Sequence, residues 1–470
     1  MSPRAGSRVE VTVSARLSDH GRAPDGNAVE ASIRQCVSDA VEGSFDEYPS
    51  RLRKLARLRA IRVGNDIIRE GASDTEVIFS FGLPAELFPV EQGGLQLLVT
   101  FLAGDLFPSE VSGCTWSSVR VVGVELPAEL RDRATELFRT NSAHSIDAIR
   151  QAFQLPTGRP LLAFSLKPRV GLTLAETRRI TLDVLAAGFN IVELDARNLA
   201  LSSAPFEEWL QLGVEAAGTG PHVTAFSPNF SMPAYQLSEV AQRWVNGISR
   251  HGPPVMKVDG GLDGLTGLQS IRMALRGQPA PIVTSYPILR NQLASAIGPS
   301  TWVDLLALSG ADIVYPGGRP TFPNERRPVW GSHAQDWSRA ARSYDSLIAR
   351  QWPMPTIAGG VHPGHLHACY ELMGPNVAFF LGGAVALHPK SPRDGAKLCV
   401  SVLEQAIELA KKAQKSGADC SGDLPDGLLK RVEATKYPSA SLNYFPPAAI
   451  FTASRVAANP PAPFYRRDVG

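Results

Sequence analysis

Residues 158–173 read GRPLLAFSLKPRVGLT, a short apolar run rich in β-forming residues that ends in Lys167 and Pro168. Seven similar runs follow, most of them about 30 residues apart, and helix-like stretches such as LAETRRITLDVLAAG fill the gaps. Strands and helices that alternate at this spacing are typical of repeated βα units, and eight such units close a (β/α)8 barrel. The eight runs are LLAFSLKP, NIVELD, HVTAFSPN, PVMKVDG, PIVTSYP, ADIVYPG, PTIAGGVHP and NVAFFLGG, and they begin at residues 161, 190, 222, 254, 281, 311, 355 and 376.

Most of these predicted strands end in a polar residue or a glycine. The active site of a (β/α)8 barrel is built at the carboxyl ends of the strands, so chemistry is expected at these positions. Polar residues also end ordinary strands, which is the alternative for any single one of them. The strand-end residues are Lys167, Asp195, Asn229, Asp259, Gly317, His362 and Gly383.

The rest of the chain has a different pattern of predicted strands and helices. Residues 1–150 predict a mixed α+β domain, because strand-like stretches interleave there with helix-like ones. We expect the barrel in residues 151–415, followed by a helical extension and tail in residues 416–470. A chain of 470 residues accommodates a barrel of about 250 residues and a smaller second domain. The N-terminal strands are expected at 8–17, 76–82 and 117–127, and the helices at 29–42, 89–104 and 128–138.

The composition argues against several classes of function. The 47 basic and 45 acidic residues are spread along the chain and leave a net charge of +2, without the basic patch that nucleic-acid-binding proteins need. No apolar run reaches the roughly 18 residues of a membrane span, and no signal-peptide core is present at the N-terminus. The 5 cysteines form no CxxC pair and predict reduced thiols. We therefore expect a cytoplasmic protein that binds neither nucleic acid nor membranes.

Five segments resemble motifs of the RuBisCO large-chain family in the same order. GRPLLAFSLKPRVGLT is similar to the family's first barrel-strand motif, in which a lysine-proline pair ends the strand. The resemblance covers most of residues 75–415, and independent motifs in one order are hard to obtain by chance. The other four segments are FLAGDLF (101–107), ALSGADIVYPGG (307–318), PTIAGGVHPGHLH (355–367) and FFLGGAVALHP (379–389).

The resemblance implies an architecture and an assembly. It implies a ferredoxin-like α+β N-terminal domain before a (β/α)8 TIM barrel, and a homodimer whose active sites are shared between subunits. Asp105 in FLAGDLF stands where the family has an asparagine that reaches into the neighbouring subunit's site. We expect Asp105 to contact the substrate there.

The strand-2 site departs from the carboxylases, so the chain is identified as a RuBisCO-like protein of the form IV type. Carboxylases carry there a lysine that becomes carbamylated, then an aspartate and a glutamate, and together these hold Mg²⁺. Counting 26 residues from Lys167, as in the family, places Glu193 at the lysine, Asp195 at the aspartate and Ala196 at the glutamate. No lysine carbamate is expected.

Lys167 matches the strand-1 lysine that moves protons during enolisation in the family. Desolvation at a strand end lowers the pKa of a lysine, which suits acid–base catalysis near neutral pH. The alternative is a rim lysine whose ammonium reaches solvent.

Three interpretations of Glu193 stay open. Glu193 and Asp195 together hold a hard cation such as Mg²⁺ with waters and substrate oxygens. Alternatively, the site works without a metal and uses one of these carboxylates as a general base. In the third interpretation, Glu193 merely pairs with a basic neighbour such as Arg169 or Lys257.

The substrate-binding groups are also altered. Ser285, Tyr286 and Tyr315 stand near positions where the carboxylases have histidines and arginine that grip a second phosphate, so a bisphosphate is not expected. Glycine pairs after strands 7 and 8 are kept, and backbone N–H groups without a neighbouring Cβ approach one anion closely. The expected substrate- or phosphate-binding residues are Arg169, Arg319, Gly359, Gly360, Gly382, Gly383 and Asp105.

Two further groups are candidates for catalysis. Lys257 and Asp259 are two residues apart on strand 4 and share one face, so they are candidates for an acid–base pair. His362 follows the first glycine pair and is expected to donate a hydrogen bond to the substrate.

The leading hypothesis is an enzyme that removes a proton next to a carbonyl of a monophosphorylated sugar or sugar acid, as an isomerase or tautomerase. A second hypothesis is a decarboxylase or hydrolase of a β-keto sugar-acid phosphate. A third is a non-catalytic binding scaffold that kept the fold.

Overall fold

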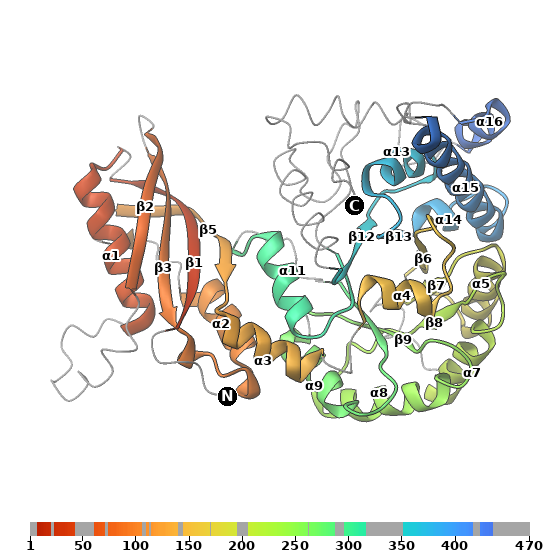
Figure 1. The fold of residues 1–470 in the computed structure, drawn as a ribbon, viewed down its shortest axis with the longest axis horizontal. Coiled ribbons are helices and arrows are strands. Elements are labelled where there is room, and N and C mark those ends of the chain that lie inside the picture. Colours follow the sequence, from red (N-terminus) through yellow and green to blue (C-terminus); the bar gives the residue numbers. More distant parts are fainter. Residues whose placement is uncertain are drawn as a thin grey trace. The chain divides into compact units, whose positions relative to one another are not determined.

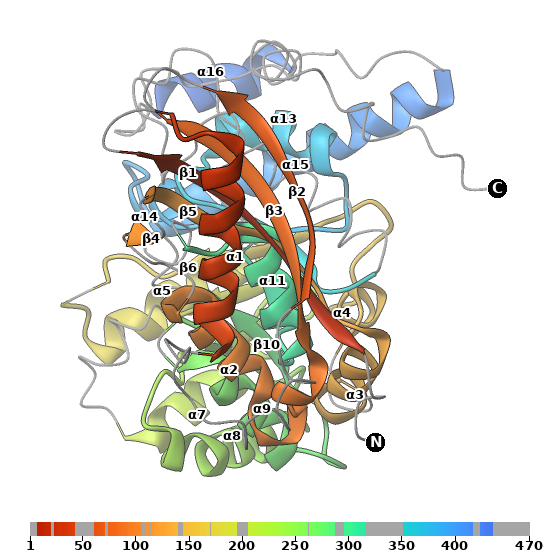
Figure 2. The same ribbon diagram turned by 90° about the vertical axis from the view of Figure 1, so that its left-hand side faces the viewer.

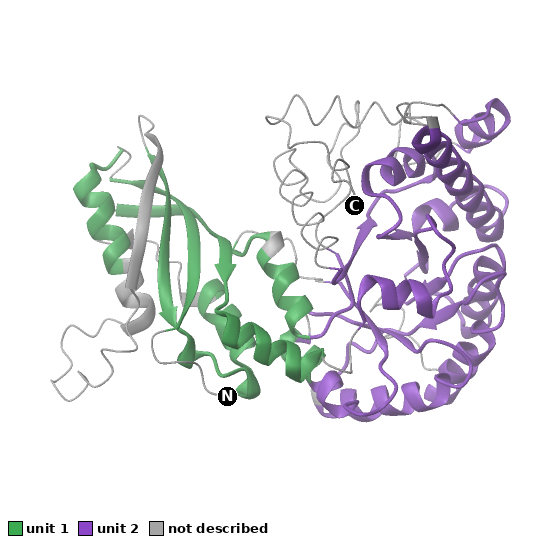
Figure 3. Cartoon of the chain, in the orientation of Figure 1, with its two compact units in different colours: residues 1–140, 264–269, 288–309 green, residues 141–263, 270–287, 310–470 purple. Residues whose placement is uncertain are grey.

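The computed structural model describes residues 7–19, 23–42, 61–70, 74–105, 110–111, 114–139, 144–169, 171–194, 205–261, 263–286, 296–315, 351–416 and 424–435. The chain divides into two compact units (Figure 3). Unit 1 contains Met1–Thr140, Gly264–Gln269 and Ile288–Ser309. Unit 2 contains Asn141–Asp263, Ser270–Pro287 and Gly310–Gly470.

Unit 1 is built on a five-stranded antiparallel sheet in the order β2-β3-β1-β5-β4 (Figure 1). Alternate residues of the central strand β1 are buried, because successive side chains of a strand point to opposite faces. The buried face of β1 consists of Val9, Val11, Val13, Ala15 and Leu17. The strands are β1 (Arg8–Ser18), β2 (Ile61–Glu70), β3 (Thr75–Pro84), β4 (Glu110–Val111) and β5 (Cys114–Glu125).

Helix α1 (Gly26–Glu42) covers one face of this sheet (Figure 2). Trp116 of β5 donates from Nε1 to Ser32 Oγ of α1 at 2.6 Å, and the edge of its ring system meets Phe79 of β3. The unit is thus the mixed α+β fold that the sequence predicts. Its other helices are η2 (Ala85–Leu87), η3 (Val90–Gln92), α2 (Gly94–Thr100), η4 (Phe101–Asp105) and α3 (Ala128–Phe138).

Unit 2 holds a parallel sheet of eight strands in the order β8-β7-β6-β13-β12-β11-β10-β9. The two end strands are joined by a parallel bridge between Asn229 and Lys257, where Lys257 N donates to Pro228 O and Phe230 N donates to Lys257 O. The sheet therefore closes into the predicted barrel, and each strand starts within three residues of its predicted position. The strands are β6 (Leu161–Ser165), β7 (Ile191–Glu193), β8 (Ala225–Ser227), β9 (Val255–Val258), β10 (Ile282–Ser285), β11 (Ile313–Val314), β12 (Met354–Ala358) and β13 (Ala378–Leu381).

Helices follow the barrel strands. The first of them, α5, begins with a capping box in which Thr173 and Glu176 bond each other's backbone N–H groups. No helix in the described ranges is both long and apolar enough to cross a membrane. The helices are α5 (Leu174–Ala186), α7 (Phe206–Ala216), α8 (Ala234–Ile248), α9 (Gly264–Ala274), α11 (Pro299–Leu308), α13 (Pro363–Met373), α14 (Gly383–Ala386), α15 (Pro392–Ser416) and α16 (Asp426–Ala434).

The barrel interior is apolar at the amino ends of the strands, where helix α4 (Ile146–Ala152) packs against it. Ile146, Ile149 and Phe153 join the same buried cluster as the first inward-facing residue of each strand. Arg150 anchors α4 by donating to Pro375 O and Arg159 O, just before two of the strands. This end of the barrel is filled, which leaves the carboxyl ends of the strands for a site.

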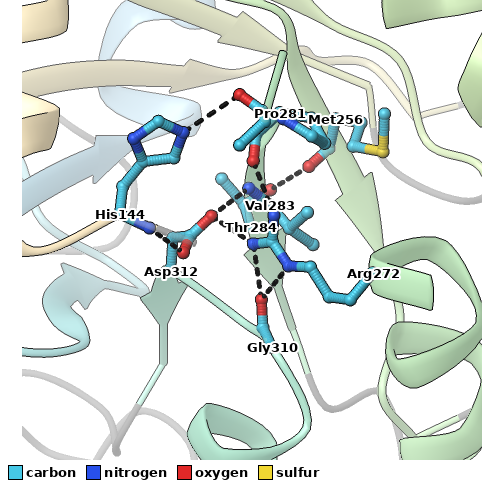
Figure 4. Close-up of polar contacts among 9 residues, drawn as sticks. His144, Met256, Arg272, Pro281, Val283, Thr284, Gly310 and Asp312 are labelled. Carbon is cyan, nitrogen blue, oxygen red and sulfur yellow. Dashed lines mark hydrogen bonds and ion pairs between the residues drawn. The ribbon is translucent and has the colours of Figure 1, made fainter. Parts of the chain in front are cut away.

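A buried ion pair also lies at the amino ends of the strands (Figure 4). Arg272 Nη2 is 2.5 Å from Asp312 Oδ2, and both side chains are fully buried. Arg272 also donates to Gly310 O and Pro281 O, while Asp312 accepts from the backbone N–H groups of Val283 and His144. The network therefore fixes the two segments that precede β10 and β11, and it ties His144, just before α4, to them.

Candidate active site

Polar side chains occupy the carboxyl ends of five barrel strands. Ser165, Glu193, Ser227, Lys257 and Tyr315 each lie two positions beyond an apolar residue of the interior cluster, and residues two apart on a strand point to the same face. Ser165 pairs in register with Glu193, which pairs with Ser227 on the next strand. The interior of the barrel thus changes from apolar to polar along its axis.

Glu193 is the centre of this polar layer and is fully buried. Its Oε1 accepts hydrogen bonds from Ser165 Oγ at 2.5 Å, Lys257 Nζ at 2.9 Å and Tyr315 OH at 3.2 Å. The Lys257 side chain is 6% exposed, so both charges of this pair are buried. A buried carboxylate needs such partners, because its desolvation costs several kcal/mol. We call Ser165, Glu193, Lys257 and Tyr315 the Glu193 cluster.

Tyr315 contributes a neutral hydroxyl to the Glu193 cluster. Burial raises the pKa of its phenol well above the ordinary value of 10, and the negative charge of Glu193 adds to the rise. The ring meets Tyr286 and Phe380 edge-on, with centroids 4.7 and 5.2 Å away. Tyr315 is therefore a fixed hydrogen-bond donor to Glu193.

Three buried polar atoms beside the Glu193 cluster have no hydrogen-bond partner among the described residues. They are Glu193 Oε2, Ser227 Oγ and Asn229 Nδ2. The carbonyl side of the Asn229 amide is engaged, since Oδ1 accepts from Ser231 N at 2.8 Å. Buried polar groups are almost always paired, so these atoms mark a place for a ligand or water that offers both donors and acceptors.

Lys167 lies two residues beyond the end of β6 and against Gly382, the residue that follows β13. A Cβ built on Gly382 would come within 3.2 Å of Lys167 Cε and 3.4 Å of Ser165 O. The glycine thus leaves room for the lysine side chain to lie across the strand end. Gly383 begins α14 and has ordinary clearance around it.

The side chains of Lys257 and Asp259, at the end of β9, have different hydrogen-bond partners. Lys257 pairs with Glu193, whereas Asp259 Oδ1 accepts from Gly261 N at 2.9 Å and its own N–H donates to Asp263 Oδ2. Burial raises the pKa of Asp263. These carboxylates shape the turn that follows the strand.

The glycine pair after β12 adopts left-handed backbone conformations, with φ of +86° at Gly359 and +68° at Gly360. Such angles strain any residue with a Cβ. His362 then caps α13, with its Nδ1 accepting from Gly364 N, and its ring lies 3.7 Å from that of His365. Because Nδ1 is an acceptor, the proton of a neutral His362 is on Nε2.

Four predicted residues are placed less fully. Asp195 and Arg319 lie outside the described residues, and Asp105 ends η4, within which its side chain is not described. Arg169 is described and half-buried, two positions beyond Lys167. Their roles stay predictions.

The sequence analysis named Asn229 only as one of the strand-end residues and did not single out Ser165 or Ser227. It interpreted Tyr315 only as the replacement of a histidine of the carboxylases. A signal was present for Ser165, which lies two residues before Lys167 on the same strand face. Ser227 and Asn229 alternate in the same way in the run HVTAFSPN.

The described part of the site does not fit a divalent cation well. No three His, Cys, Asp or Glu side chains within the described ranges gather as metal ligands. The physical argument lies at Glu193, whose Oε1 already has three donors, one of them a full positive charge. That ammonium repels a second cation at the same carboxylate.

Comparison with known sequences identifies relatives at low identity. No family model matches the chain. The sequence is 23% identical over 315 residues to a ribulose bisphosphate carboxylase large chain of Rhodopseudomonas palustris, a match that covers 61% of each chain. It is 22% identical over 353 residues to a ribulose bisphosphate carboxylase of Methanocaldococcus jannaschii, covering 70% of this chain and 78% of the relative.

Solved structures show the same fold. The octameric RuBisCO of Pyrococcus horikoshii matches with a TM-score of 0.69 at 20% identity, over 89% of this chain and 92% of the other. A RuBisCO-like protein, MtnW, from Alicyclobacillus acidocaldarius matches with a TM-score of 0.67 at 18% identity, over 87% and 98%. A RuBisCO-like protein of Burkholderia fungorum gives 0.65 at 18%, over 88% and 95%.

The fold and the position of the polar layer define a (β/α)8 barrel protein with its candidate site at the carboxyl ends of the strands. The sequence is similar to RuBisCO large chains, and the fold is the one seen in solved RuBisCO and RuBisCO-like structures.

Proposed function

We propose that the chain is a RuBisCO-like enzyme of the form IV type. It moves a proton next to a carbonyl of a monophosphorylated sugar or sugar acid, and it does not carboxylate. One observation carries the proposal: Glu193, at the position of the carbamylated lysine, is a buried carboxylate held by Ser165, Lys257 and Tyr315. A carboxylate forms no carbamate, yet a carbonyl placed beside these groups is still activated for enolisation.

The proposed reaction begins at Lys167. Its neutral amine takes the proton from the carbon next to the carbonyl, the electron pair of the broken C–H bond forms the new C=C bond, and the carbonyl oxygen becomes negative. Asn229 Nδ2 and Ser227 Oγ, which have no partner among the described residues, are donors for oxygens of the substrate. Glu193 Oε2 accepts the proton of the hydroxyl on the neighbouring carbon and passes it to the negative oxygen, so the carboxylate is restored. Lys167 returns its proton to the carbon that carried the carbonyl, the neighbouring carbon becomes the new carbonyl carbon, and the isomerisation is complete.

The phosphate is assigned to the glycine-rich turns after β12 and β13. Gly359 and Gly360 carry no Cβ and adopt left-handed conformations, so no side chain of their own stands between their backbone N–H groups and an anion. Arg169 and Arg319 supply positive charge, and His362 donates from Nε2. One such region suits a monophosphate.

The test is hydrogen–deuterium exchange at carbon. A panel of phosphorylated sugars and sugar acids is incubated with the enzyme in D2O, and incorporation at the carbon next to the carbonyl is followed by NMR. We expect exchange with at least one compound, and a loss of about 100-fold or more in Lys167→Met, which is the usual contribution of a general base. An unchanged exchange rate in Lys167→Met contradicts this mechanism.

A second candidate is decarboxylation of a β-keto sugar-acid phosphate. The observation that favours it is the buried ammonium of Lys257, since loss of CO2 from such an acid forms the same kind of enolate. Release of CO2 from a β-keto acid phosphate, measured beside deuterium exchange with its decarboxylated product, separates the two candidates.

A further inference from the structure

We propose that the ammonium of Lys257 is the resident positive charge of this site and takes the place that a divalent cation has in a metal-dependent enolising enzyme. The proposal rests on the proposed function for its catalytic consequence. Its geometric part, a carboxylate neutralised from within the protein, stands on the Glu193 cluster alone.

The ammonium of Lys257 contacts a carboxylate and an aromatic ring, and its backbone is fixed by hydrogen bonds. Lys257 Nζ is 2.9 Å from Glu193 Oε1 and lies 5.5 Å from the centroid of the Tyr286 ring, which attracts a cation with its face. The backbone of Lys257 is fixed at the junction of β8 and β9, where its N–H and C=O bond Pro228 and Phe230. A charge held in this way needs no reorganisation when negative charge develops beside it.

The carboxylate is committed to that ammonium. Glu193 Oε1 also accepts from Ser165 and Tyr315, and neither of these hydroxyls brings a charge. Lys257 is therefore the group among these three donors that balances the negative charge of Glu193. A divalent cation at Glu193 would have to displace the ammonium into a buried position or tolerate its repulsion.

The ammonium also lies where a reacting oxygen would be bound. Ser227 and Asn229, whose Oγ and Nδ2 have no partner among the described residues, neighbour Glu193 in register and Lys257 at the bridge. An enolate oxygen placed among these donors is next to Lys257 Nζ. The same lysine thus holds Glu193 and stabilises the charge that forms on the substrate.

The closing experiment measures cation binding without turnover. The melting temperature and the binding heat of the full chain are recorded with MgCl2 and with CaCl2, before and after treatment with EDTA. We expect no response from the wild type. In Lys257→Met, Glu193 loses its charge partner, so we expect both cations to raise the melting temperature. The double variant Glu193→Gln/Lys257→Met should lose this response, and Lys397→Met, at an exposed position of α15, should behave as the wild type.

Two outcomes overturn the proposal. One is a Mg²⁺-dependent rise in melting temperature of the wild type that Glu193→Gln abolishes. The other is a folded Lys257→Met variant that responds to neither cation. If Lys257→Met does not fold, the titration of the wild type decides, because it needs no substitution. None of these readouts depends on a substrate, so failure of the proposed function leaves them intact.

The catalytic consequence is measured separately, by deuterium exchange. We expect Lys257→Met to slow the exchange by about 100-fold or more, the effect of removing one group that stabilises a developing oxyanion. Lys257→Arg keeps the charge and should retain more of the rate than Lys257→Met. Equal losses of exchange rate in Lys257→Met and Lys257→Arg would show that the positive charge at this position does not contribute to the rate.

Discussion

At the scale of single residues, Glu193 shows what sequence spacing can predict and what it cannot. The 26-residue spacing from Lys167 places a glutamate where carboxylases have a lysine, and this much is in the sequence. That Lys257 rather than Arg169 pairs with it depends on which strands become neighbours across the closed barrel. The sequence could name both bases but not choose between them.

Glu193→Gln should destabilise the protein strongly. It leaves the ammonium of Lys257 buried without its charge partner, and breaking a buried pair in this way costs about 3–5 kcal/mol. Urea unfolding measures the change, and the double variant Glu193→Gln/Lys257→Met should recover much of the loss. Equal stability of the single variant and the wild type would mean that the pair is not formed.

Gly382→Ala should impair catalysis more than folding. The added Cβ approaches Lys167 Cε to 3.2 Å, so the lysine side chain has to shift by a few tenths of an ångström. A small displacement of a catalytic group lowers kcat by about 10- to 100-fold. Gly427→Ala, at an open helical position in α16, is the matched control. A normal kcat in Gly382→Ala would contradict the expected displacement of Lys167.

Tyr315 makes the free energy of unfolding depend on pH, and the direction of its pKa shift sets the sign of this dependence. Burial raises the pKa of its phenol well above 10, the value near which the unfolded chain releases this proton. Above pH 10 the folded state therefore binds more protons than the unfolded state, and the free energy of unfolding falls as pH rises. The difference in stability between the wild type and Tyr315→Phe, about 1.5–3 kcal/mol at neutral pH, should shrink above that pH in urea unfolding. A constant difference would contradict the shift.

At the scale of elements, the hydrophobic period and the composition of the sequence predict the strands. They do not predict the tertiary contacts that hold the strands in place. The eight barrel strands follow from their apolar runs, and β1, β3 and β5 from their alternation. Strand β2 reads IRVGNDIIRE, in which glycine, asparagine and charged residues hide the pattern, and the two residues of β4 are too few to show one. The packing of α4 inside the amino end of the barrel depends on tertiary contacts that no local pattern records.

The network of Arg272 and Asp312 should be needed for stability at the amino ends of β10 and β11 (Figure 4). Arg272→Met leaves the buried carboxylate of Asp312 without its positively charged partner. We expect the free energy of unfolding, measured in urea, to fall by about 3–5 kcal/mol. Arg178→Met breaks an exposed pair with Glu215 and should cost less than about 1 kcal/mol. Similar costs for the two variants would show that burial does not set the value of these pairs.

At the scale of the whole molecule, the resemblance predicts an assembly as well as a fold. It predicts a homodimer, with Asp105 from one subunit near the other subunit's site.

Light scattering coupled to size-exclusion chromatography should give a mass about twice the 50.5 kDa of the chain. A mixture of inactive subunits, one carrying Lys167→Met and the other Asp105→Ala, should regain activity if the site is shared, because one intact site forms in each mixed dimer. A monomer at all concentrations would contradict the assembly.

The junction of β8 and β9 has a consequence for motion. In the described residues, these strands meet through the bridge between Asn229 and Lys257, at the residue that holds Glu193. The amide hydrogens of Lys257 and Phe230, which form this junction, should therefore exchange with solvent only when the barrel opens there. A ligand bound between Glu193 and Asn229 would contact both β7 and the end of β8 and slow that exchange. The exchange rate of these two amides would therefore show whether the site is occupied.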